Sequence, residues 1–180
     1  MYEEMKHQVM AIYERHYHDV YQFLLYFAGS QNDAEDLTQE VFLRVIRSLE
    51  RFEERSDVKT WLFAIAKHTA MNYYRKRKWQ KLLSGDWLSG VMPASEGNPA
   101  QEAENREDEQ ELIAAIKGLP PHYRMVVILR GIKEYSVKET AEILGCSESN
   151  VKTTMHRALK LLHGKLSHTK KGELYSGLAK

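Results

Sequence analysis

Polar and basic side chains between residues 149 and 160 have types and a spacing suited to reading DNA. If this stretch is helical, each residue is rotated by about 100° from the one before it. The side chains that then point away from the apolar face are Ser149, Asn150, Thr153, His156, Arg157 and Lys160, and Lys152 lies on the flank of this set. Side chains that form hydrogen bonds, with few acids among them, suit a helix in a DNA major groove. The alternative is an ordinary helical hairpin with a solvated basic face.

The elements that would position this face form a helix-turn-helix pattern. Ser136 and Glu139 have the spacing of a capping box at the start of one helix. Gly145 suits the left-handed residue that ends that helix, and Ser147 can cap the next one. The buried face of the second helix is predicted to consist of Val151, Met155, Ala158, Leu159, Leu162 and Leu166. A capped helix, a glycine turn and a longer basic helix are typical of DNA-binding proteins.

The charge of the chain is unevenly distributed. Residues 1–90 carry 13 basic and 13 acidic side chains, residues 91–111 carry 1 and 7, and residues 112–180 carry 12 and 5, although the net charge of the whole chain is only +1. A balanced block, an acidic connector and a basic block indicate separate roles. The basic block is what a phosphate-binding module requires.

Composition and motifs argue against several other classes of protein. A chain of 180 residues with 43% hydrophobic and 28% charged residues is expected to be globular, and no apolar run is long enough to span a membrane. The single cysteine excludes an internal disulfide, and the eight histidines form no ligand set, so no metal and no cofactor is expected. No catalytic motif is found, so no enzymatic activity is expected. These features suit a reducing cytoplasm.

Three amphipathic helices are predicted in the N-terminal block. The apolar face of the first holds Met10, Tyr13, Tyr17, Val20, Leu24 and Phe27. Asn32 with Glu35 can cap the second, whose buried stripe is Leu37, Val41, Val45 and Leu49, broadened by Phe42 and Ile46. The opposite side of this helix, with Asp36, Gln39, Glu40 and Arg44, resembles a solvated face.

The third helix starts near Val58 and has a basic outer side. That side carries Lys59, Lys67, His68, Met71 and Asn72, and the helix closes with Arg75, Lys76, Arg77, Lys78 and Trp79. Cations at a helix C-terminus are favourable for the helix dipole. Bases interleaved with aromatic side chains also bind single-stranded nucleic acid. The residues alone leave these two interpretations equally open.

The predicted fold is all-α, with two small helical domains joined by a flexible acidic linker. We expect domains at 1–82 and 109–167, a linker at 83–108 and a tail at 168–180. The later domain is a helix-turn-helix four-helix module in which Pro121 begins the helix that ends at Gly131. Within the linker, residues 87–92 include apolar side chains that could bind a partner or pack on a neighbouring domain, and neither their role nor that of the tail is assigned.

Two separated stretches together resemble one family. DAEDLTQEVFLRVIRSLERF, from Asp33, and KTWLFAIAKHTAMNYYRKRK, from Lys59, resemble the promoter-melting region of bacterial sigma factors. The stretch from Leu119 that begins LPPHYRMVVILRG resembles their C-terminal promoter-binding region. The compact form with two domains is that of the extracytoplasmic-function (ECF) sigma factors. Helix-turn-helix pieces are common, but the order and separation of these motifs are highly specific.

The resemblance implies three interfaces. The surface that docks the coiled coil of the polymerase β′ subunit would comprise Asp36, Leu37, Gln39, Glu40 and Phe42. Recognition of the −10 element would involve Phe52, Ser56, Lys59, Trp61, Lys67, His68, Met71, Asn72, Arg75 and Lys76, with flipped bases entering the loop 52–60 and with Arg75 and Lys76 on phosphates. The −35 element would be read by Lys152, Thr153, His156 and Arg157, flanked by Ser149, Asn150 and Lys160. The family often has Asn where this chain has His68.

The implied function is promoter-specific transcription initiation as a dissociable subunit of RNA polymerase. The implied partners are core polymerase, through the β′ coiled coil and the β flap, promoter DNA, and an anti-sigma factor that could hold the chain at the inner face of the membrane. A stress or envelope signal would fit such control, whereas the promoter sequence and the genes controlled are not encoded in any motif. The main alternative is a free-standing helix-turn-helix regulator that binds duplex DNA as a dimer.

Overall fold

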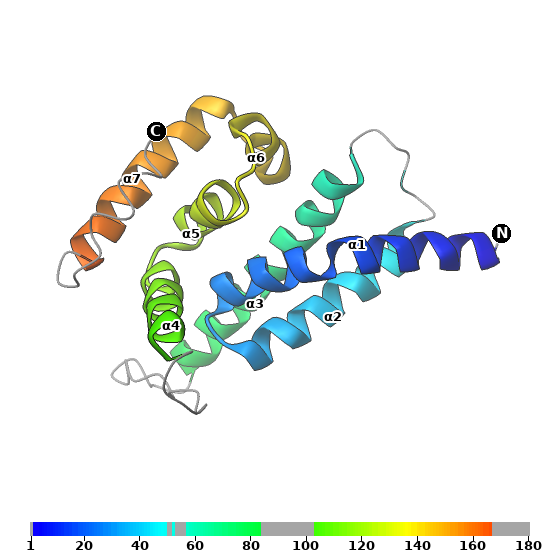
Figure 1. The fold of residues 1–180 in the computed structure, drawn as a ribbon, viewed down its shortest axis with the longest axis horizontal. Helices are drawn as coiled ribbons and strands as arrows, with labels where there is room; N and C mark the ends of the chain where they lie inside the picture. The colour runs from blue at the N-terminus through cyan, green and yellow to red at the C-terminus, as the bar shows by residue number, and fades with distance from the viewer. Residues whose placement is uncertain (1, 50–51, 53–56, 84–102, 167–180) are drawn as a thin grey trace.

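The structure is a computed structural model, and it describes residues 2–49, 52, 57–83 and 103–166. Within these ranges the chain forms seven α-helices and one π-helical segment, and no strand (Figure 1). The helices are α1 (Tyr2–Ala28), α2 (Gln31–Ser48), α3 (Val58–Leu83), α4 (Ala103–Lys117), α5 (Pro121–Val127), α6 (Val137–Leu144) and α7 (Glu148–Leu166), with the π-helix η2 (Ile128–Ile132) between α5 and α6. The prediction of an all-α fold is confirmed.

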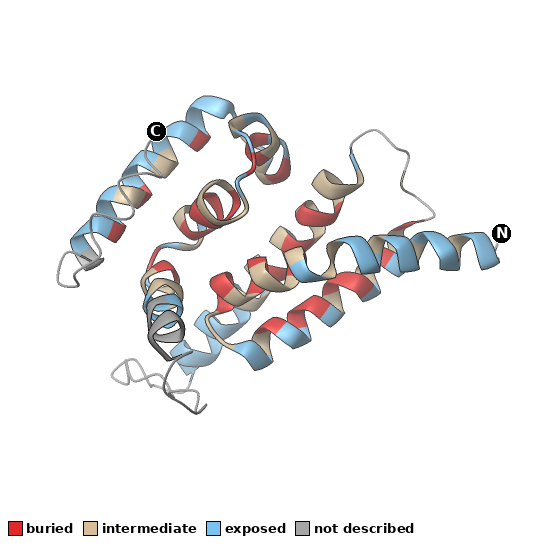
Figure 2. Cartoon of the chain, viewed as in Figure 1, coloured by how far each residue is buried: buried red, intermediate tan, exposed pale blue. Residues whose placement is uncertain are grey.

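The helices α1, α2 and α3 pack against one another, and Figure 2 shows buried positions along each of them. The core between them consists mainly of aromatic and branched side chains. Phe23, Phe27 and Phe63 are fully buried at its centre, and the ring of Phe63 meets that of Phe23 edge-on at 5.6 Å between centroids. Edge-on contacts of this kind are favourable because of the aromatic quadrupole. Leu37, Val41 and Val45 supply the buried stripe of α2 that the sequence predicts.

Three residues that the sequence predicts to be buried are exposed instead. Met10 and Tyr13 of α1 are 50% and 41% exposed, although one side of the Tyr13 ring contacts Phe42 of α2 with 4.8 Å between centroids. Ile46 of α2 is also exposed, because its position lies beyond the angular range that α1 and α3 cover. A stripe at helical spacing is buried only where a neighbouring helix reaches it.

The helix ends are capped by local hydrogen bonds. The cap of α2 is Ser30, whose Oγ accepts from the backbone N of Asp33 at 3.4 Å, so the prediction of Asn32 as the cap is wrong by two positions. The capping box of α6 is present as predicted: Glu139 N donates to Ser136 Oγ and Ser136 N donates to Glu139 Oε2. Gly145 ends α6 with φ of 67°.

The helix α5 begins at Pro121, as predicted, but continues into a π-helix. The backbone N of Lys133 donates to the carbonyl of Ile128 at 2.9 Å, which closes a wider turn than that of an α-helix. Glu134 follows with φ of 55°, a left-handed conformation that costs an L residue about 1–2 kcal/mol. The connection therefore bends sharply just before Tyr135 and α6.

The N-terminal and C-terminal helices share one continuous core. The same cluster of buried residues contains Phe23, Phe27 and Phe63 together with Ile116 of α4 and Ile128 of η2. Helices α4, α5 and η2 contact α1, and α5 and α6 contact α3. The predicted tail and residues 84–102 of the predicted linker, with the apolar segment 87–92, lie outside the described residues. Residues 103–108, which were predicted to belong to the linker, are the first turns of α4.

Candidate nucleic-acid interface

The helix α7 presents the polar face that the sequence predicts. All seven of its candidate DNA-reading residues are exposed: Ser149, Asn150, Lys152, Thr153, His156, Arg157 and Lys160. The opposite side is anchored by Val151, Ala158 and Leu162, which are buried against the rest of the C-terminal block. An anchored helix with a free polar face can enter a major groove without unfolding its support.

Local hydrogen bonds fix the start of α7. Ser147 Oγ accepts from the backbone N of Asn150 at 3.2 Å, which is the predicted cap. The side chain of Asn150 is also engaged, because its Oδ1 accepts from Thr154 Oγ1 at 3.0 Å.

The helix α3 contains seven Lys or Arg residues and no acid. Its outer residues differ in accessibility: His68, Asn72, Arg75 and Lys76 are exposed, whereas Lys59, Trp61, Lys67 and Met71 are half-buried. Burial and the neighbouring cations Lys67, Arg44 and Arg75 hold the pKa of His68 below its ordinary value, which favours the neutral imidazole.

Phe52 and Asp57 are the described residues of the loop before α3. The ring of Phe52 packs against that of Trp61 with 4.6 Å between centroids, so two of the predicted −10 residues are brought together. Ser56, the other loop residue predicted for this element, lies outside the described residues. Both residues are half-buried, and aromatic rings that keep some exposure can stack on an unpaired base.

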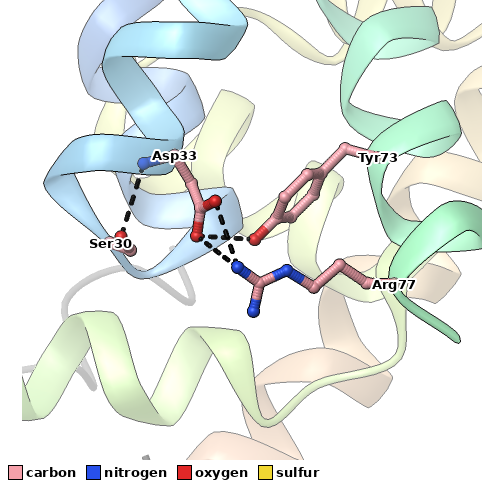
Figure 3. Close-up of polar contacts among 4 residues, drawn as sticks. All are labelled: Ser30, Asp33, Tyr73 and Arg77. Carbon is pink, nitrogen blue, oxygen red and sulfur yellow. Dashed lines mark hydrogen bonds and ion pairs between the residues drawn. The ribbon is translucent and has the colours of Figure 1, made fainter. Parts of the chain in front are cut away.

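One polar network joins the start of α2 to the C-terminal half of α3 (Figure 3). Tyr73 Oη donates to Asp33 Oδ2 at 2.8 Å, and Arg77 Nη2 lies 3.1 and 3.0 Å from the two carboxylate oxygens of Asp33. Burial and the bond to Asp33 raise the pKa of Tyr73 far above its ordinary value, so it stays protonated. Sequence reasoning missed this network, because no periodicity links residues 40 positions apart.

The network involves only one of the four basic residues in the run 75–78. Arg77 is occupied by Asp33, and its guanidinium lies 5.3 Å from the centre of the Tyr73 ring. Arg75, Lys76 and Lys78 are exposed with no carboxylate of their own helix nearby. The basic run therefore divides into one structural cation and three that can face phosphates.

The exposed side of α2 combines acids with apolar side chains. Asp36 and Gln39 are exposed, and Glu40 pairs with Arg44 at 2.6 Å on the same helix. Leu37 and Phe42, which the family resemblance places on this surface, are 6% and 5% exposed and belong to the core, so they support the surface without forming it. Leu43 and Ile46 are instead 53% and 44% exposed. Gln39, Leu43 and Ile46 are spaced by four and then three residues, so they lie on one face of the helix. This spacing is the sequence signal that could have placed Leu43 and Ile46 on the exposed surface.

The described ranges hold no group of three metal-ligating side chains. Within the same ranges, none of the helices combines the length and apolar character that a membrane span requires. The exposed faces of α3 and α7 offer hydrogen-bonding and cationic side chains, which are the groups used in nucleic-acid recognition.

Comparisons with known proteins identify both parts of the chain. The family model described as Sigma-70 region 2 matches residues 12–80, and the model described as Sigma-70, region 4 matches residues 109–162. The chain is 41% identical over 161 residues to the ECF RNA polymerase sigma factor SigX of Bacillus subtilis (strain 168), covering 88% of this chain and 83% of SigX. It is 34% identical to the ECF RNA polymerase sigma factor SigM of the same organism, covering 84% and 90%.

Two solved structures have the same fold. CnrH, in complex with the cytosolic domain of CnrY, superposes with a TM-score of 0.70 at 20% identity, covering 92% of this chain and 91% of that one. The sigma factor RpoE of Bartonella quintana, in complex with the anti-sigma factor NepR, superposes with a TM-score of 0.68 at 23% identity, covering 93% and 99%.

The fold and the paired helical surfaces are those of a sigma factor with regions 2 and 4. Both family models match in the expected order, and relatives above 30% identity align over most of their length. The chain belongs to the extracytoplasmic-function RNA polymerase sigma factors. Helices α1–α3 are called region 2 below, and helices α4–α7 with η2 are called region 4.

Proposed function

We propose that this chain directs RNA polymerase to promoters that carry specific −10 and −35 elements and that it assists in melting the duplex near the −10 element. The observation that carries the proposal is the presence, in one chain, of a basic helix without acids in region 2 and an exposed reading helix in region 4. Sequence-specific contacts from α7 would select the duplex element, and α3 would hold the melted strand.

The proposed docking surface for core polymerase lies on α2. Asp36, Gln39 and Glu40 supply charge and hydrogen bonds, and the exposed side chains of Leu43 and Ile46 supply apolar area beside them. Interfaces commonly combine an apolar centre with a polar rim. A coiled coil such as that of the β′ subunit could pack on this strip, while the β flap would contact region 4.

In the −10 interface, His68 and Asn72 would contact bases, and Arg75 and Lys76 would bind phosphates. Phe52 and Trp61, which pack on each other, would form one wall for a base flipped out of the duplex. A flipped base loses stacking in the duplex and regains it on such a wall. In the −35 interface, Lys152 and Arg157 would bind guanine edges or phosphates, and Thr153 and His156 would contact neighbouring bases.

We further propose control by an anti-sigma factor and a role in responses to stress at the cell envelope. Support comes from CnrH and RpoE, each solved with a protein partner, the latter with an anti-sigma factor. A partner that covers α2 would compete directly with polymerase. Because polymerase and promoter DNA lie in the cytoplasm, that is where the chain would act.

The test is co-elution with purified core RNA polymerase on a sizing column, without DNA and at moderate salt. A stoichiometric complex is expected for the wild type. Asp36→Lys should weaken the complex at least tenfold, and Glu35→Lys, an exposed acid one residue away on a different side of α2, should not. Failure of the wild type to co-elute, together with tight binding of the isolated chain to duplex DNA, would refute the proposal in favour of a free-standing regulator.

A further inference from the structure

The last nine residues of α3, from Arg75 to Leu83, form a basic helical segment that carries exposed apolar side chains. All nine residues are exposed, and they include five Lys or Arg and no acid. Trp79, Leu82 and Leu83 are 66%, 64% and 82% exposed. An exposed apolar cluster that is rimmed by polar residues is typical of an interaction site. This segment is called the α3 end below.

The three apolar side chains of the α3 end lie on one side of the helix. At about 100° per residue, Trp79, Leu82 and Leu83 fall within a sector of about 100°. Lys76 lies about 20° beyond one edge of this sector, and Lys78 lies about 40° beyond the other edge. The α3 end is therefore amphipathic, with an apolar strip that is bordered by a cation on each side.

Contacts on the other side of the helix turn this strip outward. Tyr73 and Arg77 both bind Asp33 at the start of α2 (Figure 3). By the same helical geometry, these two side chains point about 120° and 160° away from Trp79. The face opposite the apolar strip thus fixes α3 to α2, so a partner that binds the strip does not have to fold the helix.

The combination of side chains favours a lipid surface over a nucleic acid. Phosphates of a nucleic acid would attract Arg75, Lys76 and Lys78 but would offer no matching group to Leu82 and Leu83. An anionic bilayer offers both kinds of contact, because acyl chains lie directly beneath its negative headgroups. Each cation near such a surface strengthens binding by about fivefold. Tryptophan is also enriched at the boundary between headgroups and acyl chains.

The exposed apolar pair on α2 lacks this charge pattern. Leu43 and Ile46 are 53% and 44% exposed, but they share α2 with Asp36 and Glu40. An anionic surface would repel these two acids. Apolar exposure alone is therefore not sufficient, and its coincidence with an acid-free basic segment distinguishes the α3 end.

We propose that the α3 end binds the surface of anionic membranes, with Trp79, Leu82 and Leu83 at the boundary between headgroups and acyl chains and with Lys76 and Lys78 on lipid phosphates. Binding of this kind is peripheral and reversible, because its strength is set by a small apolar area and a few charges. The inference goes beyond the proposed function. Since Lys76 is also a proposed phosphate contact in the −10 interface, membrane and promoter DNA would compete for this surface.

Flotation of the full chain with lipid vesicles tests the proposal without polymerase or DNA. Vesicles of equal parts phosphatidylglycerol and phosphatidylcholine should bind the chain at least about tenfold more tightly than vesicles of phosphatidylcholine alone. Leu82→Gln together with Leu83→Gln should weaken binding to the anionic vesicles at least about tenfold, while glutamine retains helix propensity. Equal affinity for the two kinds of vesicle would overturn the proposal.

A matched control removes two exposed apolar side chains from other helices. Met10→Gln on α1 together with Leu161→Gln on α7 should change binding to the anionic vesicles by less than about twofold. Equal losses for this control and for the double variant at positions 82 and 83 would overturn the proposal. Lys76→Gln together with Lys78→Gln should weaken the binding by about tenfold or more, and undiminished binding would also contradict it.

Anisotropy titrations with a single-stranded oligonucleotide separate a membrane from a nucleic acid as the partner. Leu82→Gln together with Leu83→Gln should keep the oligonucleotide affinity within about twofold of wild type, because phosphate contacts come from the cations. If this variant instead loses oligonucleotide affinity and binds vesicles like wild type, the strip serves nucleic acid and the proposal is overturned.

The vesicle experiment and the co-elution experiment can fail separately. A chain that forms the polymerase complex but ignores anionic vesicles would keep the proposed function and refute membrane binding. A chain that binds anionic vesicles through Leu82 and Leu83 but does not bind core polymerase would keep membrane binding and refute the proposed function.

Discussion

Arg124 provides the sharpest test of how the two regions are held together. Its side chain is 6% exposed and donates to three carbonyls, those of Phe27, Lys117 and Leu119. These carbonyls lie at the C-terminal ends of α1 and α4, where the helices lack internal donors. The guanidinium also lies over the rings of Phe27 and Tyr74, at 4.8 and 5.8 Å. The guanidinium of Arg124 thus donates hydrogen bonds to free carbonyls at the end of one helix in region 2 and one helix in region 4.

The expected cost of Arg124→Ala follows from these partners. Each buried carbonyl left without its donor costs about 1–3 kcal/mol, and the loss is partly offset because a cation no longer has to be desolvated. With three carbonyls losing their donor and this offset subtracted, we expect a net decrease of about 3–5 kcal/mol in the free energy of unfolding. Arg124→Lys should cost roughly half as much, because an ammonium retains the charge but cannot span three carbonyls.

The assay is urea unfolding followed by circular dichroism, with linear extrapolation to water. Because one core cluster spans both regions, a single cooperative transition is expected for the wild type. Arg47→Ala, which removes an exposed arginine from α2, is the control and should change the free energy by no more than about 0.5 kcal/mol. A value for Arg124→Ala within about 1 kcal/mol of wild type, or equal losses for Ala and Lys, would refute the reasoning.

Three further predictions concern the helix-turn-helix. Gly145→Ala should destabilise the chain by about 1–2 kcal/mol, measured by urea unfolding, purely through its left-handed backbone, since nothing lies within 4 Å of the added Cβ. Hydrogen bonds from Ser136 lower the pKa of Glu139. The ionised Glu139 side chain therefore stabilises the fold above the ordinary pKa of 4.5, and this stabilisation is lost as the pH falls through the folded pKa. The difference in free energy of unfolding between wild type and Glu139→Gln should accordingly shrink between about pH 7 and pH 3. Lys152→Ala or Arg157→Ala should weaken binding of the holoenzyme to a duplex −35 element by about 1–3 kcal/mol in anisotropy titrations, unlike Lys6→Ala on α1, and undiminished binding would contradict the assignment of α7.

Local signals in the sequence were sufficient to predict most of the helix-turn-helix. The capping box at Ser136, the left-handed Gly145 and the cap at Ser147 all depend on residues within a few positions of one another, and all three are present. The exposed face of α7 followed from helical spacing alone. Short-range hydrogen bonds and steric rules act on neighbouring residues, so a single sequence reveals them.

Features that depend on distant partners were not predictable in this way. Ile46 has the spacing of a buried residue but no helix covers it, and no local pattern links Asp33 to Tyr73 and Arg77, which it binds. The docking of region 4 on α3 was also missed, because charge and composition indicated two independent domains. Hydrophobic spacing gives the direction of a side chain, whereas the identity of its neighbour is set by the packing of the whole chain.

The π-helical turn η2 sets the angular register of everything that follows it. An α-helix advances about 100° per residue, and a π-turn accommodates one residue more than an α-turn does. Removing a single residue from Ile128–Ile132 would let α5 continue as an ordinary helix, and Tyr135 would then rotate by about 100° away from Phe63 and Lys59. One inserted residue in this turn thus determines whether region 4 faces region 2 with its aromatic side chain or turns it toward solvent.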